Sequence, residues 1–137
     1  RFDDASKALV ELAASRHNAF HSSEAADIPA HRLRRAEQRG ELSRLSARVW
    51  SVTALGAPPG QNLRAATLET SGAAACHRGS CWLHRWFDSL PSTCDIWVPG
   101  RGRRVGPGVR SHRAPAIDAD RATTEIDGIR TLNAAAT

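Results

Sequence analysis

The run between Pro29 and Gly40 constrains the fold more than any other part of the chain, because each end of it carries a strong helix signal. Pro29 suits the first turn of a helix, where its missing N–H has no intrahelical partner. Gly40 suits the left-handed position at which a helix ends. Residues 30–39 between them are strong helix formers. The sequence therefore predicts a helix over residues 30–39.

A β-hairpin is expected directly after this helix. Leu42 and Leu45 lie on its first strand and residues 49–52 form the second, with residues 46–48 between them.

Two helices are expected before Pro29. Small and apolar residues recur at steps of three and four from Asp3 to His17, which is typical of one helix face. A short helix then starts at Ser22, behind the apolar Phe20. Helix, short helix, basic helix and hairpin follow one another in the order of a winged helix-turn-helix.

The rest of the chain predicts a second, smaller α+β domain. The Pro- and Gly-rich residues 56–60 form a linker between a winged helix-turn-helix domain at 1–55 and this domain at 61–137. Helices are expected at 61–69 and 73–87, a strand at 95–98 with its return strand at 109–113, and a hairpin at 124–131 that turns at Asp127-Gly128. Residues 133–137 begin a further helix, and the chain lacks Met. We therefore expect a fragment whose second domain is incomplete at its C-terminal end.

Positive charge is concentrated in two places. The chain carries a net charge of +5, and all but one of its 19 basic Lys and Arg residues are Arg. Residues 28–52 hold six Arg and two Glu, and residues 95–113 hold five Arg and one Asp, a net charge of +4 in each case. Such clusters favour polyanionic partners, although a solvated arginine-rich surface is the plainer alternative.

The basic helix has the side chains needed to read DNA. Leu33 and Ala36 are expected to face the core. On the other side, we expect one stripe to contact base edges and an adjacent stripe to contact phosphates, while the hairpin contacts the backbone or the minor groove. The first stripe is His31, Arg34 and Gln38, the second is Arg32, Arg35 and Arg39, and the hairpin supplies Arg44 and Arg48. A Gly-rich loop adds Arg101, Arg103 and Arg104 as secondary phosphate contacts.

Other chemistries are weakly supported. The cysteines at 76, 81 and 94 form no CxxC pair, and buried packing explains them better than a zinc site with His77 and His84. Ser80 lacks a nucleophile elbow, and the acids at 118–127 lack a nearby Lys. We therefore expect no catalytic residues, no metal and no cofactor. No apolar run is long enough for a membrane span and no signal peptide is visible, so a cytoplasmic protein is expected.

Several stretches together resemble antitoxins of the AbiEi family. The stretches are Phe20–Asp27, Leu33–Arg35, Arg39–Leu42, Arg48–Val52, Ala75–Ser80 with Leu83-His84, and Asp127–Ala134. The family has a Gly-Val-Tyr-type strand where this chain has Arg48-Val49-Trp50, so Arg48 and Trp50 stand in the places of the family's Gly and Tyr. Its Ser-His-x-Ser-Ala-Ala segment is similar to Ala75–Ser80, and its Gly-Ile-Pro-Val-Thr-type hairpin is similar to Asp127–Ala134.

The resemblance implies a bacterial transcriptional regulator of a type IV toxin–antitoxin system. The winged domain would bind double-stranded DNA and repress its own operon, and a C-terminal domain would counter a nucleotidyltransferase toxin. Two alternatives remain open. The chain could be a protein-interaction module that neutralises the toxin without DNA, or the non-catalytic part of a protein with a Vsr-like nuclease domain.

Overall fold

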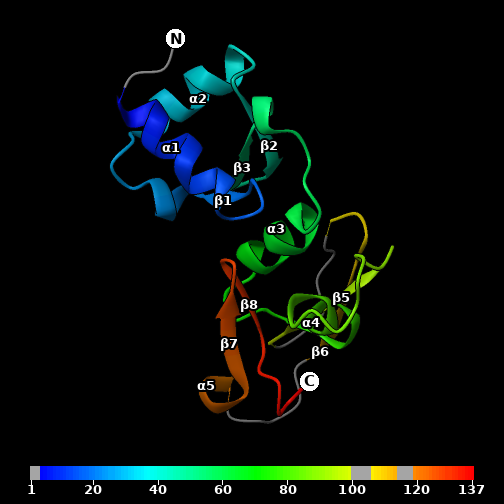
Figure 1. The fold of residues 1–137 in the computed structure, drawn as a ribbon. Coiled ribbons are helices and arrows are strands. Elements are labelled where there is room, and N and C mark those ends of the chain that lie inside the picture. Colours follow the sequence, from blue (N-terminus) through cyan, green and yellow to red (C-terminus); the bar gives the residue numbers. More distant parts are fainter. Residues whose placement is uncertain (1–3, 100–105, 114–118) are drawn as a thin grey trace.

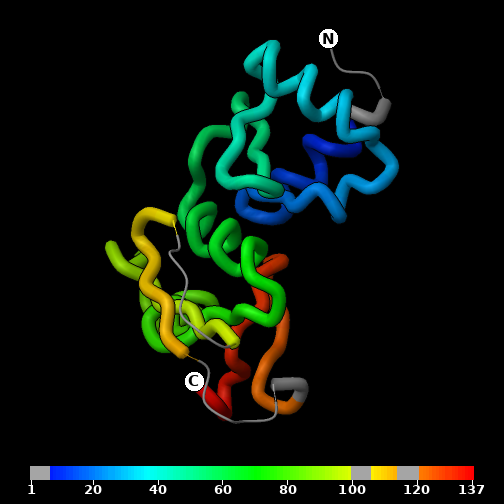
Figure 2. The backbone as a smooth tube through the Cα atoms, turned by 180° about the vertical axis from the view of Figure 1, so that it is seen from behind, coloured from blue at the N-terminus to red at the C-terminus, as the bar shows by residue number. Residues whose placement is uncertain are grey.

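The computed structural model describes residues 4–99, 106–113 and 119–137. The fold is mixed α+β, with helices and two separate sheets. Figure 1 shows two lobes, which we name the N-terminal lobe (residues 4–55) and the sheet lobe (residues 61–137), with helix α3 of the sheet lobe facing the N-terminal lobe. The view from behind in Figure 2 shows the same arrangement. The domain boundaries expected from the sequence stay a prediction.

The N-terminal lobe places its helices against a three-stranded antiparallel sheet with strand order β1-β3-β2. Its elements are α1 (Asp4–Ala14), β1 (Phe20–His21), the 3₁₀ helix η1 (Ser22–Ala25), α2 (Ala30–Gln38), β2 (Leu42–Ser46), β3 (Val49–Val52) and the 3₁₀ helix η2 (Thr53–Leu55).

Helix α2 and the following hairpin confirm the sequence prediction closely. The helix stops because Gly40 takes a left-handed conformation with φ of 77°. The amides of Gly40 and Glu41 then turn back and donate to the carbonyls of Glu37 and Ala36, both at 3.0 Å. These two hydrogen bonds satisfy carbonyl groups that the end of a helix would leave without partners. Leu42 and Val52 pair with each other on the hairpin, and both are buried.

The end of α1 and strand β1 differ from the prediction. The helix stops at Ala14, before His17, because His17 and Asn18 both take positive φ values. The Asn18 side chain accepts from the Val52 amide at 2.8 Å and donates to the Val52 carbonyl at 2.9 Å. Phe20 then pairs with Trp50 as a strand residue. The side-chain pairing of Asn18 with β3 ends the helix, and its periodicity alone could not indicate this.

The sheet lobe contains a five-stranded mixed sheet with strand order β6-β5-β4-β8-β7. The pairs β5–β6 and β4–β8 are parallel, and the others are antiparallel. Its elements are α3 (Gln61–Glu69), β4 (Ala74–Cys76), α4 (His77–Leu83), β5 (Cys94–Val98), β6 (Val109–Arg113), α5 (Ala119–Ala122), β7 (Thr123–Ile126) and β8 (Ile129–Leu132).

The single helix expected over residues 73–87 is wrong. Residues 74–76 form the buried central strand β4, and only residues 77–83 are helical. A run of alanines favours a helix on local propensity, but here each backbone edge of the run pairs with a neighbouring strand. Small side chains also fit the close packing on both faces of a central strand. Tertiary pairing therefore overrides the local preference.

Three further expectations concern the C-terminal part. The hairpin at Asp127-Gly128 is confirmed, with φ of 51° and 82° at the two turn residues. Strand β6 runs parallel to β5, so the expected return strand of a hairpin is wrong. The helix expected at 133–137 is also wrong, because this segment forms a turn around Asn133.

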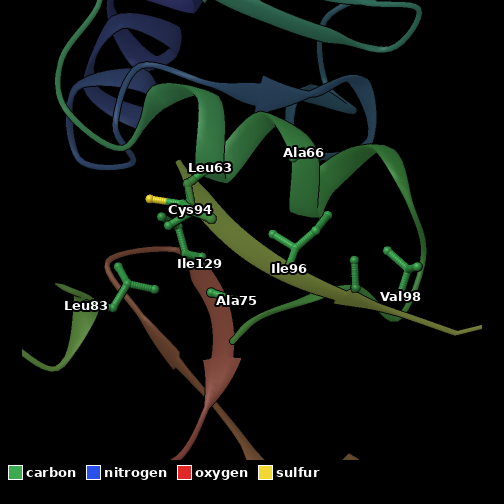
Figure 3. Packing of buried hydrophobic residues seen from close by; sticks show 9 residues of the cluster. Leu63, Ala66, Ala75, Leu83, Cys94, Ile96, Val98 and Ile129 are labelled. Atoms are coloured by element: carbon green, nitrogen blue, oxygen red, sulfur yellow. The ribbon is translucent and has the colours of Figure 1, made fainter. Parts of the chain in front are cut away.

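Each lobe has its own hydrophobic cluster. In the N-terminal lobe, Phe20, Leu33 and Trp50 pack with residues of α1 and β2. In the sheet lobe, α3 lies across β5, with Leu63 above Cys94 and Ala66 above Ile96 (Figure 3). Helix α3 also contacts β1, β2 and β3 of the other lobe. It is therefore buried on two sides, with Leu63 and Ala66 in the cluster of the sheet lobe and its other side against the N-terminal sheet.

Candidate nucleic-acid interface

The polar side of α2 points away from the rest of the N-terminal lobe. Leu33 is buried and Ala36 packs beside it, as predicted. The residues that the sequence assigned to DNA contact on this helix are all exposed: His31, Arg32, Arg34, Arg35, Gln38 and Arg39. The structure therefore brings them together on one outward surface, which we name the α2 face.

The two arginines of the β2–β3 hairpin have different surroundings. The Arg44 guanidinium stacks over the Trp50 ring, 4.7 Å from its centroid, and its Nη2 donates to Glu37 Oε1 at 3.0 Å. Arg48 is exposed at the turn of the hairpin. It lines a cleft of about 830 Å³ that lies between the two lobes. Arg44 is thus held against the protein, whereas Arg48 is available to a ligand.

Ion pairing leaves several of these cations available. Arg39 Nε lies 3.5 Å from Glu41 Oε1 at the end of α2. Within the described part of the chain, Arg34, Arg35 and Arg48 form no ion pair. The expected secondary contacts Arg101, Arg103 and Arg104 lie outside the described residues.

A buried ion network lies between the lobes. Glu24 Oε2 accepts from Arg16 Nη1 and from Arg64 Nη2, both at 2.7 Å. Arg64 is only 1% exposed, and its other terminal nitrogen donates to the Ala19 carbonyl. Burial alone would raise the pKa of Glu24, but the hydrogen bonds from Arg64 and the His21 amide, with the charges of both arginines, hold it below its ordinary value. Glu24 is therefore ionised and ties α3 to the N-terminal lobe.

A second polar cluster surrounds Asp95 on β5. Its side chain is 5% exposed and accepts from His112 Nε2 at 2.7 Å and from Arg78 Nε at 3.4 Å. The His77 ring meets the His112 ring edge-on, with centroids 5.0 Å apart. Burial would raise the pKa of Asp95, but the contacts with His112 and Arg78 lower it. A buried, ionised carboxylate thus holds basic side chains in place. We name these residues, together with Arg110, the Asp95 cluster.

The cysteines lie apart from any metal-binding arrangement. Cys76 and Cys94 are buried free thiols, and burial with the charge of Asp95 raises the pKa of Cys76 to about 12. His84 contacts the Leu132 carbonyl at 2.8 Å through Nε2. Among the residues that the structure describes, no three His, Cys, Asp or Glu side chains are placed so that they could hold one metal ion. Ser80, rejected as a nucleophile, is buried beside Thr131.

Sequence reasoning missed Arg64 and Asp95. Arg64 was passed over because an amphipathic helix is expected to bury one face, and α3 buries two. Asp95 carried a usable signal, since it stands alone among apolar residues in the strand Cys94–Val98. A lone acid inside a buried strand requires partners, and basic residues are available on the neighbouring elements.

None of the helices within residues 4–99, 106–113 and 119–137 combines the length and apolar character needed to cross a membrane. No family model matches the chain, and no curated protein matches it. Among solved structures, the chain is similar to the RV2827C protein from Mycobacterium tuberculosis, with a TM-score of 0.50 and 19% sequence identity. The likeness covers 89% of this chain and 48% of that one, so the chain spans about half of that protein's length. At this identity the likeness concerns the fold alone, and the fold it supports is mixed α+β.

Proposed function

We propose that the chain binds double-stranded DNA sequence-specifically through the α2 face and acts as a transcriptional regulator of its own type IV toxin–antitoxin operon. In this proposal the N-terminal lobe is a winged helix-turn-helix, α2 is its recognition helix and the β2–β3 hairpin is its wing. The observation that carries the proposal is the exposure of all six polar residues on the α2 face, opposite the buried Leu33.

The chemistry of the α2 face suits a duplex. Arg34 can donate two hydrogen bonds to guanine, and Gln38 can pair with adenine in the major groove. Arg35 and Arg48 are suited to backbone phosphates, which position a protein without reading sequence. Residues 29–39 contain four arginines and one glutamate, so the potential of this surface is strongly positive.

The test is fluorescence anisotropy with the protein's own upstream DNA and with a scrambled duplex, each over a salt series. Arg34→Ala is expected to weaken binding to the upstream DNA by about 10-fold or more and to reduce discrimination between the duplexes. Arg35→Ala should weaken both equally and lower the slope of log K against log salt by about 1.

The matched control is Arg113→Ala, an equal loss of charge at an exposed residue of β6 in the other lobe. It should leave affinity for the upstream DNA and the salt slope close to wild type. Weak binding that is equal on the two duplexes and insensitive to Arg34→Ala would exclude sequence-specific regulation.

A second candidate function is neutralisation of a nucleotidyltransferase toxin by direct contact. The observation in its favour is the exposed aromatic pair after α4, with Trp86 55% and Phe87 40% exposed. Exposed apolar surface of this kind marks protein-interaction sites. Co-expression with a nucleotidyltransferase encoded in the same operon should restore growth, and Trp86→Ser should abolish the rescue while leaving DNA binding unchanged.

A further inference from the structure

The Asp95 cluster contains more positive charge than its buried carboxylate needs. One cation would neutralise Asp95, and Arg78 already supplies it. His112 makes a second contact with the same carboxylate, and the His77 ring packs against His112. Arg110 is the register partner of Asp95 on β6 and is exposed. Because alternate residues of a strand share a face, Arg110 and His112 project on the same side of the sheet.

These basic groups are positioned by the protein and remain open to solvent. The Arg78 side chain is 50% exposed and the His112 side chain 37%, although Asp95 between them is 5% exposed. Arg78 contacts Asp95 through Nε, so its four terminal N–H donors are left for another acceptor. Asp95 therefore fixes the Arg78 guanidinium and the His112 ring in place without covering them.

We propose that the Asp95 cluster binds a phosphate group. The Arg78 and Arg110 guanidinium groups are permanent cations with N–H donors, which suits an oxyanion, and a guanidinium fork matches the geometry of phosphate oxygens. The ligand is either a phosphodiester of a nucleic-acid backbone or a free phosphate. This site lies on the sheet lobe, whereas the α2 face belongs to the N-terminal lobe (Figure 1). It is therefore separate from the DNA-reading surface proposed above.

The experiment is a titration of the full chain followed by NMR, using the backbone amides, the histidine side chains and the arginine Nε–H groups. One arm adds inorganic phosphate at constant ionic strength, and the other adds a DNA duplex without terminal phosphates. We expect saturable shifts at His77, Arg78, Arg110 and His112 in at least one arm. Shifts with phosphate alone identify a free phosphate as the ligand, and shifts with the duplex identify a nucleic-acid backbone.

Two variants test the assignment. Arg78→Gln should weaken the binding that shifts the cluster by about tenfold, as expected for loss of a charge-assisted hydrogen bond. Arg113→Gln removes the same charge one residue from His112, on the opposite face of β6. This variant should change the affinity of the binding that shifts the cluster by less than about twofold. The wild-type titration itself is independent of how well either variant folds.

The proposal is overturned if neither arm shifts the cluster, or if the shifts are spread over surface arginines without saturating. Arg34→Ala separates this site from the α2 face. It should abolish specific recognition of the upstream DNA and leave the phosphate-induced shifts of the Asp95 cluster unchanged. Loss of DNA recognition is thus measured with the Arg34 variant, and loss of phosphate binding is measured from the NMR shifts of the Asp95 cluster.

Discussion

Glu24 stabilises two arginines through a single carboxylate oxygen. Arg16 and Arg64 both donate to its Oε2 at 2.7 Å, and Arg64 is buried. A buried guanidinium without a charged partner is costly, because burial removes its hydration and nothing replaces the lost interaction. The stability of this contact therefore depends on the charge of Glu24.

Glu24→Gln should lower the free energy of unfolding by about 2 kcal/mol at pH 7, the typical value of hydrogen bonds to a charged group. The folded protein holds the pKa of Glu24 below its ordinary value of 4.5, so the unfolded chain binds the proton more readily. The stabilisation is present above pH 4.5 and is lost as the pH falls through the folded pKa. Urea unfolding at several pH values should therefore show the difference from wild type shrinking in acid.

The control for this prediction is Glu69→Gln, at an exposed residue of α3 that lines the same cleft. Its unfolding free energy should follow wild type at every pH. An equal loss in both variants would mean that the effect comes from net charge and not from the network around Arg64.

Cys76 should be chemically inert in the folded protein. Its thiol is buried, and its pKa is raised to about 12, first by burial and then by the negative charge of Asp95. The reactive form of cysteine is the thiolate, which is negligible at pH 8 for such a group. Iodoacetamide at pH 8 should modify Cys81 in the native protein and all three cysteines in urea, as followed by mass spectrometry of peptides. Rapid native labelling of Cys76 would contradict the burial described here.

At the scale of elements, two turn glycines differ in the space around them. Both have a positive φ, which disfavours a side chain, but only one would also bring an added Cβ into contact with neighbouring atoms. Gly40 ends α2 with φ of 77° and has nothing within 4 Å of where a Cβ would lie. Gly128 turns the β7–β8 hairpin with φ of 82°, and its Cβ would lie 3.0 Å from Arg64 Nε and 3.1 Å from Arg16 Cγ. Both positions disfavour side chains, but only one is also crowded.

Gly40→Ala should destabilise the protein by about 1 kcal/mol, the usual penalty for an alanine in the left-handed region. Gly128→Ala should cost at least about 1 kcal/mol more, because the added methyl group displaces the two arginines. Chemical denaturation of the two variants side by side measures the difference. Equal losses would show that the hairpin moves away from Arg64 without cost.

Elements with strong local signals were predictable from the sequence, and elements fixed by distant pairing were not. Helix α2 has Pro29 before it and Gly40 after it, so its bounds follow from local chemistry. Strand β4 is an alanine run whose partners, β5 and β8, lie far along the chain. The parallel pairing of β6 was missed for the same reason, because a strand pattern carries no direction.

The candidate sites divide in the same way. Exposure of Arg34, Arg35 and the other residues of the α2 face follows from helical periodicity and is confirmed. Their role in DNA binding stays a prediction. The Asp95 cluster draws on β5, β6 and α4, and only the tertiary fold brings these together. Periodicity within one element cannot reveal a site of this kind.

At the scale of the whole molecule, α3 of the sheet lobe also contacts the N-terminal lobe and so links the two. Leu63 and Ala66 pack in the sheet lobe, while Arg64 reaches Glu24 and Ala19 in the N-terminal lobe. Gln61 adds a hydrogen bond of 3.0 Å to the Asn18 carbonyl. A helix shared in this way should make the two lobes unfold together.

Wild-type protein is expected to unfold in one transition, with equal calorimetric and van't Hoff enthalpies. Arg64→Leu removes the ion pair across the lobes but leaves Glu24 paired with Arg16, and it should split the calorimetric profile into two transitions. Arg130→Leu, at another arginine that lines the cleft, should preserve a single transition. One unchanged transition in Arg64→Leu would mean that the other contacts of α3 with the N-terminal lobe, the Gln61 hydrogen bond included, suffice to couple the lobes.

The parallel pairing of β4 with β8 also sets an order of events during synthesis. Every strand of the N-terminal sheet has been translated by Val52, so this lobe can form while the remainder is still being made. Strand β4 instead gains its second neighbour only when Ile129–Leu132 emerges, more than 50 residues later. Until then this edge of β4 is open. Helix α3, which is translated between the N-terminal lobe and β4, can already be held by Glu24 through Arg64. The N-terminal lobe can therefore fold first and hold α3 in place while β4 still lacks its partner β8.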